Sequence, residues 1–271
     1  MGRPLWLVEL IKKTFPNRFL VAKLTKWPVI GRILDHWLFE GDDLVYLPQN
    51  RVIPINESLD PPRSLVLPSQ IVDHFIEKAD YHWIMDRCIC RDAEKCEDYP
   101  MDLGCLFLGE AALGINPQLG RRVTKEEALE HAQRCREAGL VHLVGRNKLD
   151  TVWLGVGPGH KLLTVCNCCP CCCLWRVLPY VALDIGAKVA RMPGVTATVS
   201  DQCVGCGTCT ESVCFVDAIH LVNGRAVRSD ACRGCGRCVS VCPEGAIEIS
   251  IDNDQFVQEM INRISSLVDV S

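Results

Sequence analysis

The sequence lacks a long hydrophobic run, because a charged residue interrupts every apolar stretch well before the ~20 residues that a membrane-spanning helix needs. It also lacks a Gly-x-Gly-x-x-Gly element after a predicted strand, so nothing supports a Rossmann site for a nicotinamide or flavin cofactor. The formal net charge is −4, which gives no general signature of nucleic-acid binding. These absences argue against a membrane-spanning protein, a Rossmann dehydrogenase and a nucleic-acid-binding protein.

Cysteine is what the chain has in abundance, with 19 among 271 residues. Secreted disulfide scaffolds are short and carry a signal peptide, and we find neither feature. The cysteines instead cluster at short CxxC and CxC spacing, which is typical of thiolates that bind metal in a reducing compartment. We therefore expect a cytoplasmic protein from an organism or niche low in oxygen. A chain of this length, 48% hydrophobic, is long enough for about two domains with cores.

One cysteine pattern occurs twice, over residues 203–214 and 232–243. Each copy has three cysteines at i, i+3 and i+6 with glycines between them, and a fourth cysteine follows. Three thiolates at this spacing can wrap one corner of a cubane cluster, whereas structural zinc is the alternative for isolated CxxC pairs. The repeat therefore predicts iron–sulfur clusters.

The repeat resembles that of bacterial two-cluster ferredoxins, over about residues 197 to 251. Two departures are the four residues that precede Cys214 and the Phe215 that stands where that family usually has proline. The resemblance implies a pseudo-twofold α+β fold and two [4Fe-4S] clusters, with the fourth cysteine of each run ligating the other cluster. The implied ligand sets are Cys203, Cys206, Cys209 and Cys242 for one cluster, and Cys232, Cys235, Cys238 and Cys214 for the other.

The same region has the alternating pattern of short strands. We expect them near Thr196 to Val199, Ile219 to Val222, Ala226 to Arg228 and Ala246 to Ile251. The Asn223-Gly224 pair predicts a tight hairpin turn between the middle two.

A second cysteine-rich region precedes the repeat. In Cys88-Ile-Cys90-Arg91 the CxC pair would place two sulfurs on one side of an extended strand, and Arg87 and Arg91 would lower the thiol pKa values. Six further cysteines lie within residues 166–173, too many for one cluster. A subset on one strand face can join the CxC pair around a third centre, and the others can ligate a fourth centre, act as redox thiols or be bystanders. Ordinary buried cysteines are the alternative. The predicted ligands in this region are Cys88, Cys90, Cys96, Cys105, Cys166 and Cys168.

From about residue 85 onward the chain resembles a family of anaerobe ferredoxin-type proteins. The shared features are a CxCR segment, the GCLFLG element at 104–109, the EEALEH…EAGLVH segment at 126–142, the CNCCxCCC run and the ferredoxin repeat. This resemblance implies electron transfer without naming a substrate. The adjacent cysteine pairs are also similar to the CCG motifs of heterodisulfide reductase subunits, although the long spacing and the CxxC ending of that motif are missing.

Residues 1–38 differ from the rest, with seven basic residues against two acidic ones and three of the six tryptophans. A basic, tryptophan-bearing amphipathic segment can lie on an anionic membrane surface or dock in the groove of a partner protein. The alternative is that its apolar side chains cover the protein's own core. Those side chains are Leu20, Leu24, Trp27, Leu34 and Trp37.

The segments between these regions give further expectations. Residues 44–47 and 52–55 look like extended pieces of a connector with a hairpin, broken by prolines. Ser69 is a candidate N-cap for a helix that buries Ile71, Val72, Phe75 and Ile76. The capping box Thr124–Glu127 predicts a helix up to Gly139. Strands at 140–144 and 151–156 would follow as a hairpin, giving a helix-hairpin unit that resembles a winged helix.

Together these patterns predict an α+β chain in four parts. They are a basic segment and connector (1–68), a mixed α/β cysteine-rich domain (69–195), a ferredoxin domain (196–251) and a C-terminal helix (252–271). The expected function is electron transfer with redox partner proteins, without nucleic acid, in the cytoplasm or on the inner face of the membrane. Two alternatives are a reductase that acts on a disulfide or another small substrate at the N-terminal cysteines, and an iron–sulfur redox sensor that uses the helix-hairpin unit.

Overall fold

The computed structural model describes residues 2–50, 67–252 and 255–271. Its centre is a seven-stranded sheet in the order β4-β2-β3-β6-β5-β1-β7. Neighbouring strands are antiparallel except β1 and β7, which are parallel. The strands are β1 (Asp43–Tyr46), β2 (His82–Met85), β3 (Leu106–Leu108), β4 (Gly120–Val123), β5 (Val141–Arg146), β6 (Leu163–Cys168) and β7 (Val189–Arg191).

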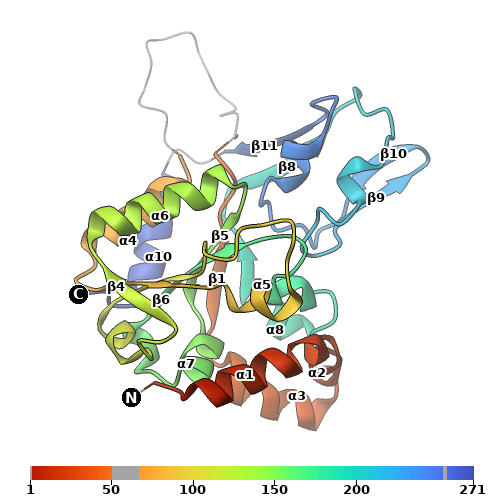
Figure 1. Cartoon of the computed structure of the whole chain (residues 1–271). Coiled ribbons are helices and arrows are strands. Elements are labelled where there is room, and N and C mark those ends of the chain that lie inside the picture. The colour runs from red at the N-terminus through yellow and green to blue at the C-terminus, as the bar shows by residue number, and fades with distance from the viewer. Residues whose placement is uncertain (1, 51–66, 253–254) are drawn as a thin grey trace.

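Helices cover both faces of this sheet (Figure 1). Side chains of β1 alternate between the two faces, as a strand requires: Val45 and Leu47 pack in one core, whereas Leu44 and Tyr46 pack in the other. The first core is shared with α4 (Ser69–Lys78), α6 (Lys125–Glu137) and α10 (Phe256–Ser265). On the second face lie α5 (Ile89–Glu94), α7 (Lys148–Leu154), α8 (Leu183–Ala187) and the N-terminal helices.

Two helix starts agree with the sequence pattern. Thr124 accepts a hydrogen bond from the Glu127 backbone N–H at 3.2 Å, and the Thr124 N–H donates to the Glu127 carboxylate at 2.8 Å, which confirms the capping box. Helix α4 is also confirmed, with its predicted apolar stripe buried; Ser69 is its first helical residue, and Pro68 is the N-cap.

Two other expectations are wrong. Residues 44–46 belong to an interior strand, not to a connector: β1 is paired on both sides, and Leu44 to Leu47 are at most 2% exposed. Residues 151–154 of the predicted strand at 151–156 lie in helix α7, and β5, its expected partner, pairs instead with β1 and β6. The buried Asp150 carboxylate, which accepts hydrogen bonds from Asn147 and Trp153, holds the first turns of α7. No helix-hairpin unit therefore forms there, and the predicted strand at 52–55 lies outside the described residues.

Residues 195–251, called here the cysteine repeat domain, form two antiparallel two-stranded sheets, β8–β11 and β9–β10. The four predicted strands are confirmed, and Asn223 and Gly224 both have positive φ (51° and 76°), as the predicted tight turn requires. The elements are β8 (Val195–Val199), the 3₁₀ turn η6 (Thr208–Thr210), β9 (Ile219–Val222), β10 (Arg225–Arg228), α9 (Arg237–Val241) and β11 (Ile247–Ile251). The predicted C-terminal helix is α10, and it returns to pack on α4 in the first core.

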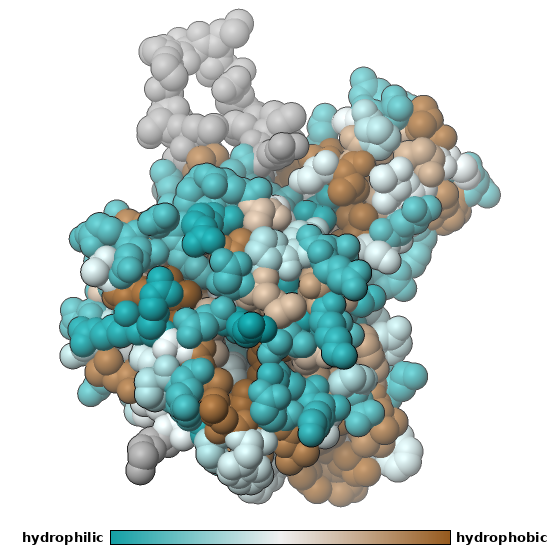
Figure 2. Space-filling view, viewed as in Figure 1, coloured by the Kyte–Doolittle hydropathy of each residue, from teal (hydrophilic) through white to brown (hydrophobic). Residues whose placement is uncertain are grey.

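The N-terminal segment folds into short helices along one edge of the molecule (Figure 1). They are α1 (Leu5–Thr14), α2 (Arg18–Leu24), α3 (Pro28–Leu34) and the π-helical η2 (Asp35–Phe39), with the 3₁₀ turn η1 (Phe15–Asn17) between α1 and α2. Leu20, Trp27 and Trp37 are 60–68% exposed, so these three do not cover the core. Figure 2 shows hydrophobic residues gathered at this lower edge. In the described parts of the chain, no helix is both long and apolar enough to cross a bilayer.

Candidate metal centres

Four cysteines of the cysteine repeat domain surround one small pocket. Two of them accept hydrogen bonds from backbone N–H groups: Cys203 Sγ from Ala226 at 3.4 Å, and Cys242 Sγ from Ala246 at 3.3 Å. Such N–H···S contacts stabilise a thiolate. The four are Cys203, Cys206, Cys209 and Cys242.

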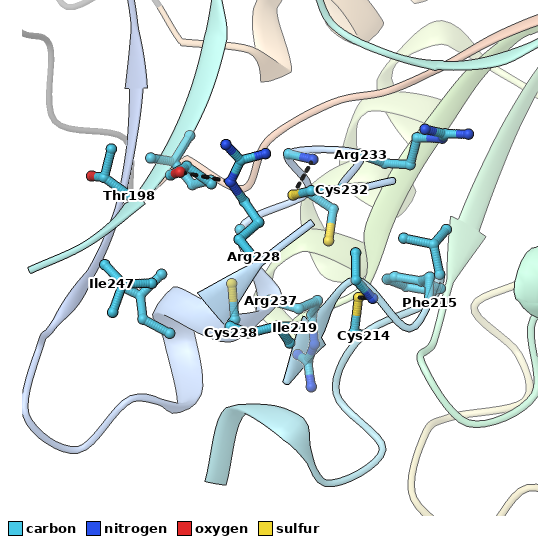
Figure 3. A pocket seen from close by; sticks show the side chains of 18 residues that line it. Thr198, Cys214, Phe215, Ile219, Arg228, Cys232, Arg233, Arg237, Cys238 and Ile247 are labelled. Atoms are coloured by element: carbon cyan, nitrogen blue, oxygen red, sulfur yellow. Dashed lines mark hydrogen bonds between the residues drawn. The ribbon is translucent and has the colours of Figure 1, made fainter. Parts of the chain in front are cut away.

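The other four cysteines of the domain surround a second pocket, shown in Figure 3. The labelled Cys214, Cys232 and Cys238 turn their sulfurs toward the space between them, and Cys235 completes the lining. One backbone contact repeats, because Ala218 N–H donates to Cys214 Sγ at 3.2 Å as Ala246 N–H does to Cys242 Sγ. Cys232 Sγ accepts from the Gly234 N–H at 3.4 Å. The structure thus brings together the two crossed sets that the sequence predicts.

Glycines make both loops possible. Gly205, Gly207, Gly234 and Gly236 stand at equivalent places in the two runs and have φ of +70°, +84°, +65° and +82°. Residues that carry a Cβ are strained at such positive φ values, whereas glycine is not. A Cβ at Gly205 would also lie 2.0 Å from the Gly224 carbonyl oxygen, so no other residue fits that loop as it stands.

A third set of cysteines lines a cavity of about 160 Å³ on the second face of the large sheet. Cys166 and Cys168 are two residues apart on β6, so both face this cavity, and they meet Cys105 and Cys173 at Sγ–Sγ distances of 3.9 Å and 3.3 Å respectively. A single water needs only ~10–15 Å³ of such volume, so the space suits a group of several atoms. The thiols around it are those of Cys88, Cys90, Cys105, Cys166, Cys168, Cys169 and Cys173.

The CxC pair reaches this cavity from a helix rather than from the expected strand. Cys88 is the N-cap of α5 and Cys90 is its second residue. A hydrogen bond from the Cys90 thiol lowers the pKa of Cys88; burial opposes this shift, and the Arg91 charge adds to it. Cys88 is therefore the thiol of this pair that ionises more readily.

Arg91 is a buried cation beside these thiols, with 0% exposure. It donates to the carbonyl oxygens of Asn167 and Leu103. Its Nε has no hydrogen-bond partner among the described residues. Burial would lower the Arg91 pKa, but the neighbouring Cys88 and Cys169 outweigh this effect and raise it. A buried charge needs a counter-charge, so this arrangement fits anionic thiolates. The predicted similar role of Arg87 is wrong: its side chain is 69% exposed and lies 3.6 Å from Asp92.

Cys96 lies apart from the cavity, although its position in the sequence grouped it with Cys88 and Cys90. Its sulfur is instead close to those of Cys169, Cys171 and Cys172. The sequence pattern assigns no ligand role to these three cysteines or to Cys173. The Cys169-Pro-Cys171-Cys172 spacing does indicate a metal site, but it does not identify Cys96 as the fourth ligand.

Tyr46 joins the cavity to the cysteine repeat domain, and nothing in the sequence marks it. It is fully buried and packs in one cluster with Cys168 and Cys173. Its ring also contacts that of Phe215, with centroids 5.4 Å apart and planes tilted by 40°. Cys235 packs against the same cluster. The Tyr46 hydroxyl has no hydrogen-bond partner among the described residues. Phe215, the residue that departs from the ferredoxin pattern, thus makes the ring contact with Tyr46.

Comparison with known proteins agrees with these thiol sets. Residues 210–252 match the family model described as the LdpA Fe-S cluster-binding domain. The chain is an iron–sulfur protein. The match covers five of the eight cysteines in the cysteine repeat domain of this iron–sulfur protein: Cys214, Cys232, Cys235, Cys238 and Cys242. No curated protein and no solved structure matches the chain.

Proposed function

We propose that this iron–sulfur protein transfers electrons, as a ferredoxin-type carrier or as an electron-transfer subunit of a larger oxidoreductase. The two crossed sets in the cysteine repeat domain would each hold a [4Fe-4S] cluster, within a ferredoxin fold. The 160 Å³ cavity would hold a third iron–sulfur centre. Such clusters supply one-electron transfer when bound, at potentials that hydrogen bonds to sulfur and solvent exposure adjust.

The observation that carries this proposal is the continuous succession of the three thiol sets. Cys206 is exposed at one end. Cys209 and Cys238, from different sets, belong to one side-chain cluster, and Cys235 packs on the cluster of Tyr46 and Cys168. A thiol set reachable from solvent is therefore linked through packed side chains to a buried one. This is the arrangement that an electron-relay protein needs.

The experiment is a determination of iron and acid-labile sulfide on protein purified without oxygen, with EPR of the reduced state. Three cubanes would give about twelve irons per chain and two would give about eight. We expect about twelve in the wild type and about eight in Cys166→Ser, whose substitution lies only in the cavity. About eight in the wild type would refute the third centre, and fewer would refute the two-cluster domain.

A second candidate function is reduction of a small disulfide at the cavity. It is favoured by the surplus of thiols, since seven cysteines line a cavity where a cubane needs four. Two electrons from reduced clusters and two protons from solvent would cleave the disulfide into two thiols. Reoxidation of the dithionite-reduced chain by a small disulfide, without a partner protein and only with Cys166 intact, would select this function over a carrier.

We also propose that the N-terminal helices rest on an anionic membrane surface. Trp6 and Leu10 share one face of α1, and Val29, Ile33 and Trp37 recur every four residues through α3 and η2; all five are 47–68% exposed. Exposed cations surround them, namely Arg3, Lys13, Lys23, Lys26 and Arg32. Exposed tryptophan interspersed with cations is typical of helices that lie in the headgroup region.

A further inference from the structure

Beside the cavity, four cysteines converge on one point, and of these only Cys169 also lines the cavity. Cys96, Cys169, Cys171 and Cys172 have their sulfurs within 4.8 Å of one another. The Sγ atoms of Cys96 and Cys171 are 3.6 Å apart, as are those of Cys171 and Cys172. Within residues 2–50, 67–252 and 255–271, no other group of three or more histidine, cysteine or acidic side chains comes as close together.

These distances suit a single ion. Four thiolates at about 2.3 Å from a tetrahedral zinc ion lie about 3.8 Å from one another. A cubane binds its thiolates at four different iron corners, so their sulfurs must stand farther apart. The third thiol set differs, because its sulfurs approach one another only in pairs around the 160 Å³ cavity, such as Cys105 with Cys166 and Cys168 with Cys173, and no three of them come within 4.8 Å of one another among the described residues.

We propose that Cys96, Cys169, Cys171 and Cys172 bind one zinc ion in a structural site that is separate from the iron–sulfur centres. Four protein sulfurs complete the tetrahedron and leave no open position, which distinguishes structural from catalytic zinc. The site is independent of the electron-transfer proposal, since it needs neither the cavity nor the cysteine repeat domain to hold a cluster.

The local backbone presents these thiols. Helix α5 ends at Glu94, and Lys95, in the left-handed region with φ +52°, turns the chain so that the Cys96 N–H donates to the Arg91 carbonyl. Opposite Cys96, the turn after β6 supplies the other three thiols. Two of the four are buried and two are half-buried, so an ion can enter from solvent.

The charges around the group favour a dianionic site. Zinc with four thiolates carries a net charge of −2, and two arginines lie close enough to offset it. The buried Arg91 has Cys169 among the neighbouring thiols that raise its pKa, and Arg176 donates to the Cys171 carbonyl oxygen. Buried charges are tolerated where they are paired in this way.

The zinc site would also stabilise the contact between this part of the protein and the Cys235–Cys238 loop of the cysteine repeat domain. Tyr99, which belongs to the same side-chain cluster as Cys96, accepts a hydrogen bond from Arg237 Nη2 at 2.7 Å. Arg237 lies between Cys235 and Cys238, and its Nη1 also donates to the Gly139 carbonyl at 3.0 Å. Zinc would therefore fix the surface that supports this loop.

The test is the zinc, iron and sulfide content of anaerobically purified Cys96→Ala against the wild type. We expect about one zinc per wild-type chain and a loss of at least tenfold in the variant, with iron and sulfide unchanged. Cys135→Ala is the matched control, because Cys135 is fully buried in the same side-chain cluster but does not belong to the converging group. It should keep its zinc.

X-ray absorption at the zinc edge on the wild type tests the site without any variant. We expect four sulfur neighbours at about 2.3 Å. Fewer sulfurs, no zinc in the wild type, zinc retained by Cys96→Ala, or iron and sulfide lost together in that variant would each overturn the proposal.

Discussion

Tyr46→Phe is the substitution that tests the contact between the cavity and the cysteine repeat domain. The ring would keep its contact with Phe215, and only the buried hydroxyl would be removed. That hydroxyl has no partner among the described residues, and the thiols of Cys168, Cys173 and Cys235 are its charged neighbours. A buried unpaired hydroxyl costs about 1–3 kcal/mol. We therefore expect it to donate to a thiolate that binds a cluster.

The expected magnitude follows from the charge of the acceptor. A thiolate gains negative charge when its cluster is reduced, so the hydrogen bond stabilises the reduced state more. A difference of about 1.4 kcal/mol between the two states corresponds to about 59 mV for one electron. We expect Tyr46→Phe to lower one midpoint potential by a few tens of millivolts, with iron and sulfide content unchanged.

The assay is an anaerobic redox titration followed by EPR. Tyr180→Phe is the matched control, because Tyr180 is 40% exposed and its ring packs on Phe19 instead of near the thiol sets. If every midpoint potential in Tyr46→Phe stays where Tyr180→Phe leaves it, the inferred hydrogen bond does not exist.

Two further predictions concern other parts of the chain. Burial raises the pKa of Asp42 from 3.8 to about 7, so between these pH values the folded chain holds a proton that the unfolded chain has lost. The free energy of unfolding should then fall by about 3 kcal/mol as the pH rises from 4 to 7. Thermal unfolding of Asp42→Asn should show a flatter pH dependence, and an unchanged profile would contradict this. Trp6→Ala with Trp37→Ala should weaken sedimentation with anionic vesicles at least tenfold, whereas Val227→Ala, an exposed apolar site on β10, should not; equal binding by both variants would favour a protein partner.

The cysteine repeat domain was the part of the structure most accessible from sequence. Its strands and the Asn223-Gly224 turn occur where they were expected, because alternation and turn chemistry act over a few residues. The crossed grouping of the eight cysteines also came from short spacing together with a family resemblance. Local patterns suffice where the residues that meet are near one another in the chain.

Elsewhere the same patterns misled. Residues 151–156 alternate like a strand, yet β5 had both edges occupied, and the segment forms helix α7. Cys96 is close to Cys90 in sequence, yet the left-handed turn at Lys95 directs its sulfur away from the cavity and toward Cys169, Cys171 and Cys172. In each case a contact made by distant residues outweighed the local preference.

By itself the sequence determined that this protein binds metal through thiolates, since cysteines at this density and spacing have no other common use in a chain of this kind. It also determined the two loops of the cysteine repeat domain. Only the tertiary structure decided which of the other cysteines meet, because β6 pairs with β3 and the chain on either side of these strands then brings together cysteines as remote as Cys96 and Cys171, 75 residues apart. It alone placed Tyr46 and Arg91, whose roles depend on burial beside thiols that are remote in sequence.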